Sequence, residues 1–480
     1  MKFGLKSTRK PLNFFLYVLI ILSVMFPGKV VTAQDQQPDG PVYVVQDGDS
    51  LWDIALRFGV SMDDLEQANG ISNPNQLTAG AKLVIPGLEG IHGELTTETI
   101  SLGETLRSLS RKYQVSTETL VRLNHLTSPV ELYAGSSLII PEQNDSSLYT
   151  HRVAVSPGQS LLELSVLQNT DPWKIVSTNA LSGTWSAVPG DVLRLQGDQP
   201  DGPGALPGSV SSVEITPNYL KQGKAAVFKI AAADGMEFSG SLMGHELHFF
   251  PDGQGDYIAM QGIYAMADPG IYPVEIKGTS ANGNSFSFSQ MVNVQTVNYP
   301  YDAPITVDPT TIDPAVTKPE DAQWFALAAP VTPERMWSGI FQMPTPLPVK
   351  YCLETNDCWA SRFGNRRSYN GSPYNAFHTG LDIGGKIGTE IYAAAAGVVV
   401  FTGPLTVRGN ATMIDHGWGV YSAYMHQSKI LVHPGEHVEA GQLIGLIGNT
   451  GRVEGPHLHW EILVGGVQVD PLDWLQEEFP

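Results

Sequence analysis

The feature that constrains the fold most is a sequence repeat with a step of 55 residues in the first half of the chain. The peptide GDSL at 48–51 recurs as GETL at 103–106 and as GQSL at 158–161. One asparagine and one glycine keep the same step, at Asn69, Asn124 and Asn179 and at Gly80, Gly135 and Gly190. Three copies in register predict three small units of the same fold, one after another.

Each copy is predicted to fold in the order strand, helix, helix, strand. In the first copy, a short strand ends at a turn around Gly48, and Leu51, Ile54, Ala55 and Phe58 then follow at helical spacing. A second helix is expected next, and KLVIP closes the unit as a second strand. The predicted units span 41–87, 94–142 and 150–197, and the third is the most divergent in sequence.

Downstream of the repeats, the sequence changes character twice. Turn-forming residues at 197–204 predict a linker. Residues 209–296 contain short alternating runs broken by Gly and Asn, a pattern typical of a small antiparallel β-sandwich. A Pro- and Asp-rich stretch at 297–335 is predicted to be a second linker, before a final domain at 336–476. The fold class expected is therefore multidomain α+β.

Charge and the N-terminal segment restrict the partners and the location. The formal net charge of −20 argues against a nucleic-acid partner, since phosphate contacts need a surplus of Lys and Arg. Basic residues before an apolar segment predict a signal peptide at 1–33, and hence a secreted or cell-envelope protein. An uncleaved signal anchor is the alternative, and the only membrane contact expected. In an oxidising exterior, Cys352 and Cys358 are predicted to form a disulfide.

Histidines concentrate in the final domain, where seven of the chain's 12 lie between His378 and His459. His457 and His459 share one face of an expected strand, because alternate side chains point to the same side. His378 and Asp382, in HTGLD, are spaced to share a face of another strand, and nearby glycines argue against a helix. Two imidazoles and one carboxylate suit Zn²⁺ and leave a fourth position for water.

The repeats resemble the LysM module, a small domain that binds N-acetylglucosamine-containing glycans. The resemblance is carried by YVVQDGDSLWDIALRFGV and LTAGAKLVIP in the first copy and by ISLGETLRSLSRKYQVSTETLVRLNHL in the second, whereas the third copy is degenerate. It implies that peptidoglycan is a partner of the chain. The approximate glycan contacts that it implies are Gly48, Asp49, Asn69, Gly103 and Asn124.

The final domain resembles the lysostaphin-type, or LytM-like, zinc metallopeptidases, which cut peptidoglycan cross-bridges. The resemblance is carried by NAFHTGLDIGG, YSAYMHQS and GPHLHWEI. It implies a mainly antiparallel β domain of the duplicated hybrid motif type. It also implies that His378, Asp382 and His459 hold the zinc, while His426 and His457 lie beside it as catalytic groups.

The resemblance implies that this zinc site hydrolyses a peptide bond. Zinc lowers the pKa of its water to about 7, and His457 and His426 are expected to act as base and as oxyanion donor, in an order that the sequence leaves open. Glu461, on the same strand face, is a candidate to fix an imidazole tautomer, with an exposed carboxylate as the alternative. The predicted function is a secreted peptidoglycan endopeptidase that LysM repeats target to glycan strands.

Two other functions are weaker alternatives. A catalytically inactive, wall-binding domain of the same fold would regulate another cell-wall hydrolase, but such domains typically lack metal ligands, and here none is missing. VHPGEHVEAGQLIGLIGN resembles the sheet of biotinyl or lipoyl carriers, but the turn at 448–451 has no lysine for attachment. Segments 351–375 and 402–411 are expected to line the groove and to set which bond is cleaved.

Overall fold

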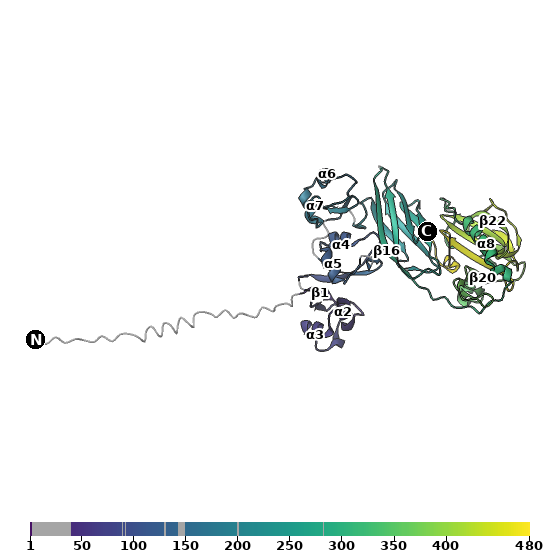
Figure 1. The fold of residues 1–480 in the computed structure, drawn as a ribbon, viewed down its shortest axis with the longest axis horizontal. Coiled ribbons are helices and arrows are strands. Elements are labelled where there is room, and N and C mark those ends of the chain that lie inside the picture. The colour runs from purple at the N-terminus through teal and green to yellow at the C-terminus, as the bar shows by residue number, and fades with distance from the viewer. Residues whose placement is uncertain are drawn as a thin grey trace. The chain divides into compact units, whose positions relative to one another are not determined.

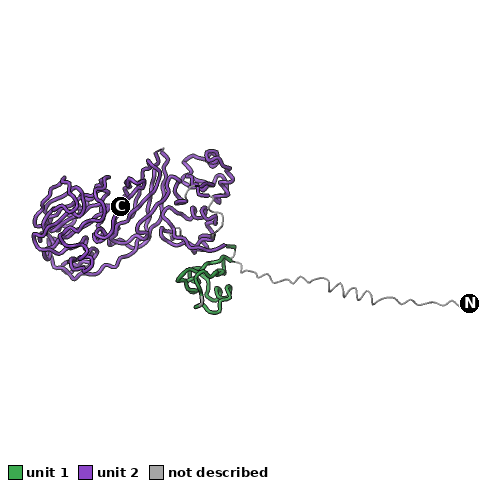
Figure 2. Tube along the Cα trace, turned by 180° about the vertical axis from the view of Figure 1, so that it is seen from behind, with its two compact units in different colours: residues 1–92 green, residues 93–480 purple. Residues whose placement is uncertain are grey.

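The computed structural model describes Met1 and residues 40–480, except 89, 92, 129–130, 143–148, 199–200 and 282. Apart from Met1, the predicted signal peptide at 1–33 lies outside the described residues. The chain divides into two compact units, Met1–His92 and Gly93–Pro480 (Figure 2). No helix in the described part of the chain is long and apolar enough to cross a membrane.

The first unit contains the first repeat. Its elements are β1 (Val42–Val44), α2 (Leu51–Phe58), α3 (Met62–Asn69), η1 (Pro74–Gln76) and β2 (Lys82–Val84), and β1 pairs antiparallel with β2. Each α-helix begins after a serine whose hydroxyl accepts a backbone N–H of the first turn, from Asp53 or Asp64. Each ends at a glycine with positive φ, which glycine adopts at no steric cost. The predicted order strand, helix, helix, strand is confirmed for this copy.

The second and third repeats begin the second unit (Figure 1). The second repeat contains β3 (Glu94–Thr99), α4 (Leu106–Tyr113), α5 (Thr117–Leu123), β4 (Tyr133–Ala134) and β5 (Ser137–Glu142). The third contains β6 (His151–Ala154), α6 (Leu161–Leu167), α7 (Pro172–Thr178) and β7 (Val192–Leu195). The outer strands pair antiparallel in both, β3 with β5 and β6 with β7. The repeat in the sequence is therefore also a repeat in the structure.

The repeated asparagine fastens the second helix of each unit to its last strand. The Asn69 side-chain nitrogen donates to Leu65 O and Val84 O at 2.9 and 2.8 Å, and its oxygen accepts Val84 N–H at 2.7 Å. Asn124 and Asn179 make the same three contacts in their own repeats. Asparagine suits this position because its short side chain carries both a donor and an acceptor.

The region predicted as a β-sandwich at 209–296 forms two sheets around one core. One sheet has the order β13-β14-β10-β8, and the other the order β12-β11-β15-β16, which β4 of the second repeat extends by parallel pairing. Phe228 and Ile276 come from the two sheets and meet in one apolar cluster. The strand bounds are β8 (Val210–Thr216), β9 (Leu220–Lys221), β10 (Ala225–Ala232), β11 (Glu237–Leu242), β12 (His245–His248), β13 (Phe250–Pro251), β14 (Asp256–Gly262), β15 (Gly270–Thr279) and β16 (Ser285–Gln295).

The stretch 297–335, predicted to be a linker, contains the short helix η4 (Pro309–Ile312) and the helix α8 (Pro314–Leu327), which packs on the final domain (Figure 1). Asp313 caps α8 by accepting Ala315 N–H, and the proline after it occupies the first turn. The Asp and Pro content that suggested a linker thus begins a helix. Trp324 of α8 is fully buried in an apolar cluster on the sheet. This segment belongs to the final domain, which corrects the linker prediction.

The final domain is built on a ten-stranded antiparallel sheet whose main path is β17-β20-β27-β24-β23-β22-β25. One face of β27 places Trp460 in the main core. The opposite face carries His457, His459 and Glu461, and α8 packs on this same face. The bounds are β17 (Trp359–Ser361), β18 (Arg366–Arg367), β19 (Ala376–Phe377), β20 (Leu381–Gly384), β21 (Glu390–Tyr392), β22 (Gly397–Leu405), β23 (Gly409–Gly417), β24 (Val420–Ile430), β25 (His437–Val438), β26 (Leu443–Ile447), β27 (His457–Val464), β28 (Val467–Val469) and α10 (Pro471–Trp474).

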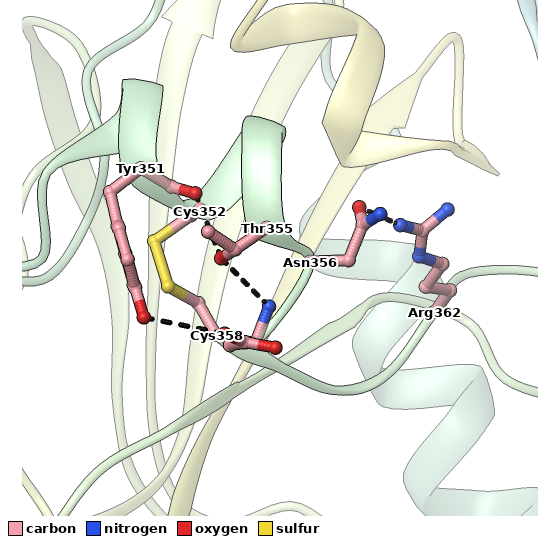
Figure 3. The surroundings of a disulfide bond; sticks show 7 residues. Tyr351, Cys352, Thr355, Asn356, Cys358 and Arg362 are labelled. Atoms are coloured by element: carbon pink, nitrogen blue, oxygen red, sulfur yellow. Dashed lines mark hydrogen bonds between the residues drawn. A yellow bond between two sulfur atoms is a disulfide. The ribbon is translucent and has the colours of Figure 1, made fainter.

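The predicted disulfide is present and joins Cys352 in α9 (Val349–Thr355) to Cys358 (Figure 3). Because it closes a short loop, with a sequence separation of 6, chain entropy gives it about 2 kcal/mol. Asn356, inside this loop, accepts a hydrogen bond from the Arg362 side chain (Figure 3). The backbone oxygen of Arg362 lies 2.9 Å from His378 Nδ1, so the disulfide loop lies next to the predicted ligand His378.

Candidate metal centre

Two neighbouring strands bring the predicted metal ligands together. β20 pairs antiparallel with β27, so that Asp382 lies opposite His459, and His378 lies just before β20. His378 Nε2 lies 2.9 Å from both Asp382 Oδ1 and His459 Nδ1, and these last two atoms are 2.8 Å apart. All three side chains are buried. Within the described residues, no other set of three or more His, Cys, Asp and Glu side chains converges in this way.

The outer nitrogens of both imidazoles face hydrogen-bond acceptors. His378 Nδ1 lies 2.9 Å from Arg362 O, and His459 Nε2 lies 3.2 Å from Glu461 Oε1. These oxygens only accept, so the outer nitrogens carry protons and the inner nitrogens are left as lone pairs. Two lone pairs and a carboxylate oxygen that face one another are stabilised only by a cation, either a proton or a metal ion. Imidazole nitrogen and carboxylate oxygen are ordinary zinc ligands, so the donor set fits zinc.

The charges around Asp382 favour its ionised form. Burial alone would raise the pKa of Asp382, but His378 and His459 outweigh burial and hold it well below its usual range. Arg367 lies 3.3 Å from Asp382 Oδ2, which leaves Oδ1 for the centre. Burial also acts to lower the pKa of His459, yet its hydrogen bonds to Asp382 and Glu461 raise it to about 9. A proton therefore competes with a metal ion for His459 Nδ1, and metal binding releases that proton.

Glu461 and a residue outside the predicted site hold His459 in place. The buried Glu461 carboxylate accepts hydrogen bonds from Thr379 Oγ1 at 2.5 Å, His459 Nε2 at 3.2 Å and Trp324 Nε1 at 3.1 Å. The exposed-carboxylate alternative for Glu461 was wrong, since the side chain is fully enclosed. Trp324 was missed because it lies in the stretch read as a linker. The helix N-cap at Asp313 was the one sequence feature that could have indicated that Trp324 lies in a helix.

His426 and His457 lie beside the three converging atoms. His457 Nε2 is 3.5 Å from Asp382 Oδ1, and the ring centroids of His426 and His457 are 5.0 Å apart. Each ring donates Nδ1–H to a backbone carbonyl at 2.8 Å, His426 to Thr450 and His457 to Gly455. In the neutral form, each ring therefore has an unprotonated Nε2, which is a proton acceptor.

The protonation state of His426 limits how this residue could serve as the expected oxyanion donor. Burial, together with the neighbouring His459 and His457, lowers the pKa of His426 to about 3. His426 is therefore neutral at ordinary pH. Its Nδ1–H is committed to Thr450, so its Nε2 can donate to an oxyanion only after it has accepted a proton.

Comparison with protein-family models identifies the domain that contains these histidines. The model of Peptidase family M23 matches residues 376–471, which include the three converging residues and both neighbouring histidines. Residues 376–471 form an M23 peptidase domain. The LysM domain model matches residues 43–86 and 99–141, so the M23 domain follows two LysM domains in the chain.

The curated relatives match a limited part of this chain. Peptidoglycan DD-endopeptidase ShyA of Vibrio cholerae is 45% identical over 123 residues, which are 26% of this chain and 29% of ShyA. DD-carboxypeptidase/endopeptidase Mpg of Neisseria meningitidis is 43% identical over 95 residues, 20% of this chain and 22% of Mpg. The chain thus spans less than a third of either relative. The solved antimicrobial peptidase lysostaphin from Staphylococcus simulans is 35% identical with a TM-score of 0.20, and the match covers 21% of this chain and 44% of that one.

Helix α8 also holds a hairpin of the M23 domain that was expected to line the groove. The buried Glu320 carboxylate accepts the backbone N–H groups of Thr406, Val407 and Arg408 at distances from 2.7 to 3.2 Å. The carbonyl of Arg408 in turn accepts the backbone N–H of His426 at 3.1 Å. The helix therefore supports both sides of the site, His459 through Trp324 and His426 through this hairpin.

The other histidines of the M23 domain lie away from the converging atoms. His416 is fully buried and bonds Ala396 O and Ser422 Oγ, both at 2.7 Å. Burial lowers its pKa to about 4, so it is a neutral core residue. His433 and His437 are exposed.

The residues implied as glycan contacts in the LysM domains have diverse surroundings. Gly48 is exposed at a turn with a φ of 87°, whereas Gly103, its equivalent, is buried. Asp49 accepts Tyr43 O–H at 2.6 Å and Gln46 N–H at 2.8 Å within its own domain. The donors of Asn69 and Asn124 are taken up by the helix-to-strand contacts described above. The structure thus gives these asparagines a structural role, and the glycan contacts implied for them stay a prediction.

Proposed function

We propose that this chain is a secreted, zinc-dependent endopeptidase that cleaves peptide cross-bridges of peptidoglycan and is held on glycan strands by LysM domains. The observation that carries the proposal is the convergence of His378 Nε2, Asp382 Oδ1 and His459 Nδ1 within 2.9 Å of one another. Two further imidazoles with free Nε2 atoms lie beside them. A regulator that only binds the wall has no need for this arrangement, and no observation favours that alternative.

The hydrogen bonds suggest the role of each residue. His378, Asp382 and His459 are the proposed zinc ligands, oriented by Arg362 O, Arg367 and Glu461. Bound zinc supplies Lewis acidity toward a peptide carbonyl and lowers the pKa of water to about 7. His457 or His426 accepts a proton from the attacking water at Nε2. The same proton passes to the leaving amine nitrogen as the C–N bond breaks.

The names of the relatives suggest the bond that is cleaved. ShyA is named a peptidoglycan DD-endopeptidase, and Mpg a DD-carboxypeptidase/endopeptidase. Since both are more than 40% identical in the matched region, we propose a bond between two D-amino acids of a cross-link as the target here. The segments 351–375 and 402–411 would then select among such bonds.

The remaining assignments rest on the sequence and on the element order. Repeat 150–197 is proposed to be a third LysM module, because it has the same order of elements and the same asparagine contacts. A β-sandwich-like domain at 209–296 and the duplicated hybrid motif type for the M23 domain complete the proposed architecture. The signal peptide proposed at 1–33 and the proposed peptidoglycan substrate support a secreted, cell-envelope location.

Clearing of a peptidoglycan suspension tests this function. We expect purified, insoluble peptidoglycan to lose turbidity when the chain and zinc are present. A chelator should stop the clearing, and excess zinc should restore it, because the proposed hydrolysis needs a zinc ion at His378, Asp382 and His459. The regulator alternative predicts no clearing unless another hydrolase is added. Clearing that continues unchanged in chelator would contradict the role of zinc.

Replacing Trp324 by Phe should weaken zinc binding without unfolding the domain. The change removes the indole N–H that Glu461 accepts at 3.1 Å, and so loosens the partner of His459. Changes of this kind beyond the ligands typically cost 10–100-fold in metal affinity, and we expect about tenfold. Competition with a chromophoric chelator measures it.

Trp474→Phe is the matched control, because Trp474 is also fully buried but its Nε1 has no hydrogen-bond partner in the described structure. It should leave the zinc affinity at the wild-type value. An equal loss in both variants would show that tryptophan volume, and not the hydrogen bond to Glu461, is what matters.

A further inference from the structure

Each repeat has one end at which two turns lie side by side. One turn precedes the first helix and the other precedes the last strand, and we call this end the paired-turn edge. A backbone hydrogen bond of 2.8 Å joins the two turns in every copy: Gly80 N–H to Val45 O, Gly135 N–H to Ile100 O, and Gly190 N–H to Val155 O. The paired-turn edges comprise residues 46–50 with 77–81, 101–105 with 132–136, and 156–160 with 187–191.

The paired-turn edge is open in the first and third repeats and closed in the second. Gly48 and Gly158 are exposed, and a Cβ at either position would have no neighbour within 4 Å. Gly103, the equivalent residue of the second repeat, is buried, and a Cβ there would lie 2.4 Å from Pro203 Cβ. The second turn shows the same contrast, exposed at Gly80 and Gly190 but buried at Gly135.

Hydrogen bonds from the β-sandwich-like domain and from the segment before it close the second edge. Gly103 N–H donates to Gln290 Oε1 at 2.8 Å, and Gly103 O accepts Ala205 N–H at 3.0 Å. Gly135 O accepts Tyr219 O–H at 2.5 Å. These are backbone groups of the turns, the kind through which a LysM module would hold a sugar. A glycan could reach them only by displacing the domain that already pairs them.

In the sequence, one residue distinguishes the closed edge of the second repeat from the two open edges. Leu102 stands where the first repeat has Asp47 and the third has Pro157. Its side chain is buried in the core cluster of the β-sandwich-like domain, whereas Asp47 and Pro157 are exposed. Removing a leucine side chain from water is favourable, which favours a closed edge in the second repeat alone.

The open edge of the third repeat lies next to exposed apolar side chains. Trp185 and Val188, in the segment that leads to Gly190, are 77% and 51% exposed. At this edge the third repeat presents exposed apolar side chains, whereas the turn glycines of the second repeat are covered.

We propose that the second repeat is a structural joint that does not bind glycan, and that N-acetylglucosamine-containing glycan is held at the paired-turn edges of the first and third repeats. The identity of the ligand rests on the proposed function. The assignment of repeats rests on the contacts above. This assignment exchanges the roles of the second and third repeats, because sequence similarity suggested that the first two copies bind glycan and that the third is degenerate.

Hydrogen exchange of the full chain, read by mass spectrometry, tests the proposal. The probe is the N-acetylglucosamine pentamer at saturating concentration, which has no peptide bond for the M23 domain to cut. We expect exchange to slow by about tenfold or more at 46–50 and 77–81 and at 156–160 and 187–191. Added pentamer should change nothing at 101–105 and 132–136. Slowing at these last segments, or its absence at the third repeat when the first responds, would overturn the proposal.

An experiment without ligand separates this proposal from the glycan assignment itself. The closed edge predicts slow exchange at 101–105 in the free protein and fast exchange at 46–50 and 156–160. Gln290→Ala removes the partner of Gly103 N–H and should speed exchange at 101–105, whereas Ser289→Ala, at an exposed neighbour on the same strand, should not. If no repeat responds to the pentamer, the glycan assignment fails. If 101–105 exchanges as fast as 46–50, the structural joint fails.

Discussion

We expect His459→Ala to abolish zinc binding and peptidoglycan cleavage, and His457→Ala to keep one zinc ion per chain and lose turnover. His459 Nδ1 is one of only three converging atoms, at 2.9 and 2.8 Å from the other two. Its loss leaves two ligands, too few for a stable zinc site. We expect the zinc affinity to fall by more than about 100-fold, beyond the range for residues that only orient a ligand.

His457 lies beside the three converging atoms and is not one of the proposed ligands. Its Nε2 lies 3.5 Å from Asp382 Oδ1, and its Nδ1–H is committed to Gly455 O. We expect His457→Ala to retain zinc and to lower kcat by about 10²–10⁴-fold, the range for a lost acid or base. Metal analysis after dialysis against a weak chelator measures the zinc content, with the exposed His433→Ala as control. Equal zinc loss in both variants would contradict the division between ligand and base.

Replacing His426 should cut turnover while the metal stays bound. His426 is neutral, its Nδ1–H is held by Thr450 O, and its ring centroid lies 5.9 Å from that of His459. Three protein ligands are already present, and a fourth imidazole would displace the reactive water. We expect kcat to fall by about 10²-fold or more and KM to change little, because the group acts in the transition state.

The backbone of His426 decides which replacement is informative. Its φ is 62°, in the left-handed region where most side chains are strained. His426→Asn is preferred to His426→Ala, since asparagine tolerates this conformation. Zinc content and thermal stability near the wild-type values are the internal controls. A variant that keeps full turnover on peptidoglycan would remove His426 from the mechanism.

Short-range periodicity predicted that His457 and His459 share one strand face and that His378 and Asp382 share another, and the resemblance to lysostaphin-type peptidases then selected His378, Asp382 and His459 as the ligands. His457 and His459 are two apart on one strand, and pairing with the strand of HTGLD places Asp382 opposite His459. The nitrogen that each imidazole presents was not predictable. It depends on acceptors such as Arg362 O, which tertiary packing brings to the ring.

Two other features depend on contacts between distant parts of the chain. Trp324 and Glu461 are 137 residues apart, and only the packing of α8 makes them partners. Gly48 and Gly103 are the same residue in the same motif, yet one is exposed and the other buried. The local sequence could not show which of the two glycines is buried, because the difference comes from Gln290, 187 residues beyond Gly103. Leu102 in place of Asp47 was the one nearby sign.

Mass spectrometry of digested peptidoglycan tests the central claim most directly. Purified peptidoglycan is incubated with the zinc-loaded chain and then solubilised with a muramidase, and the fragments are weighed. The proposal predicts that cross-linked dimers become monomers with a net gain of one water, and that each cut leaves one new amino group and one new carboxylate. His459→Ala should leave the dimers intact. Intact dimers with the wild-type chain, or glycan fragments released before the muramidase is added, would contradict a zinc endopeptidase of the cross-bridge.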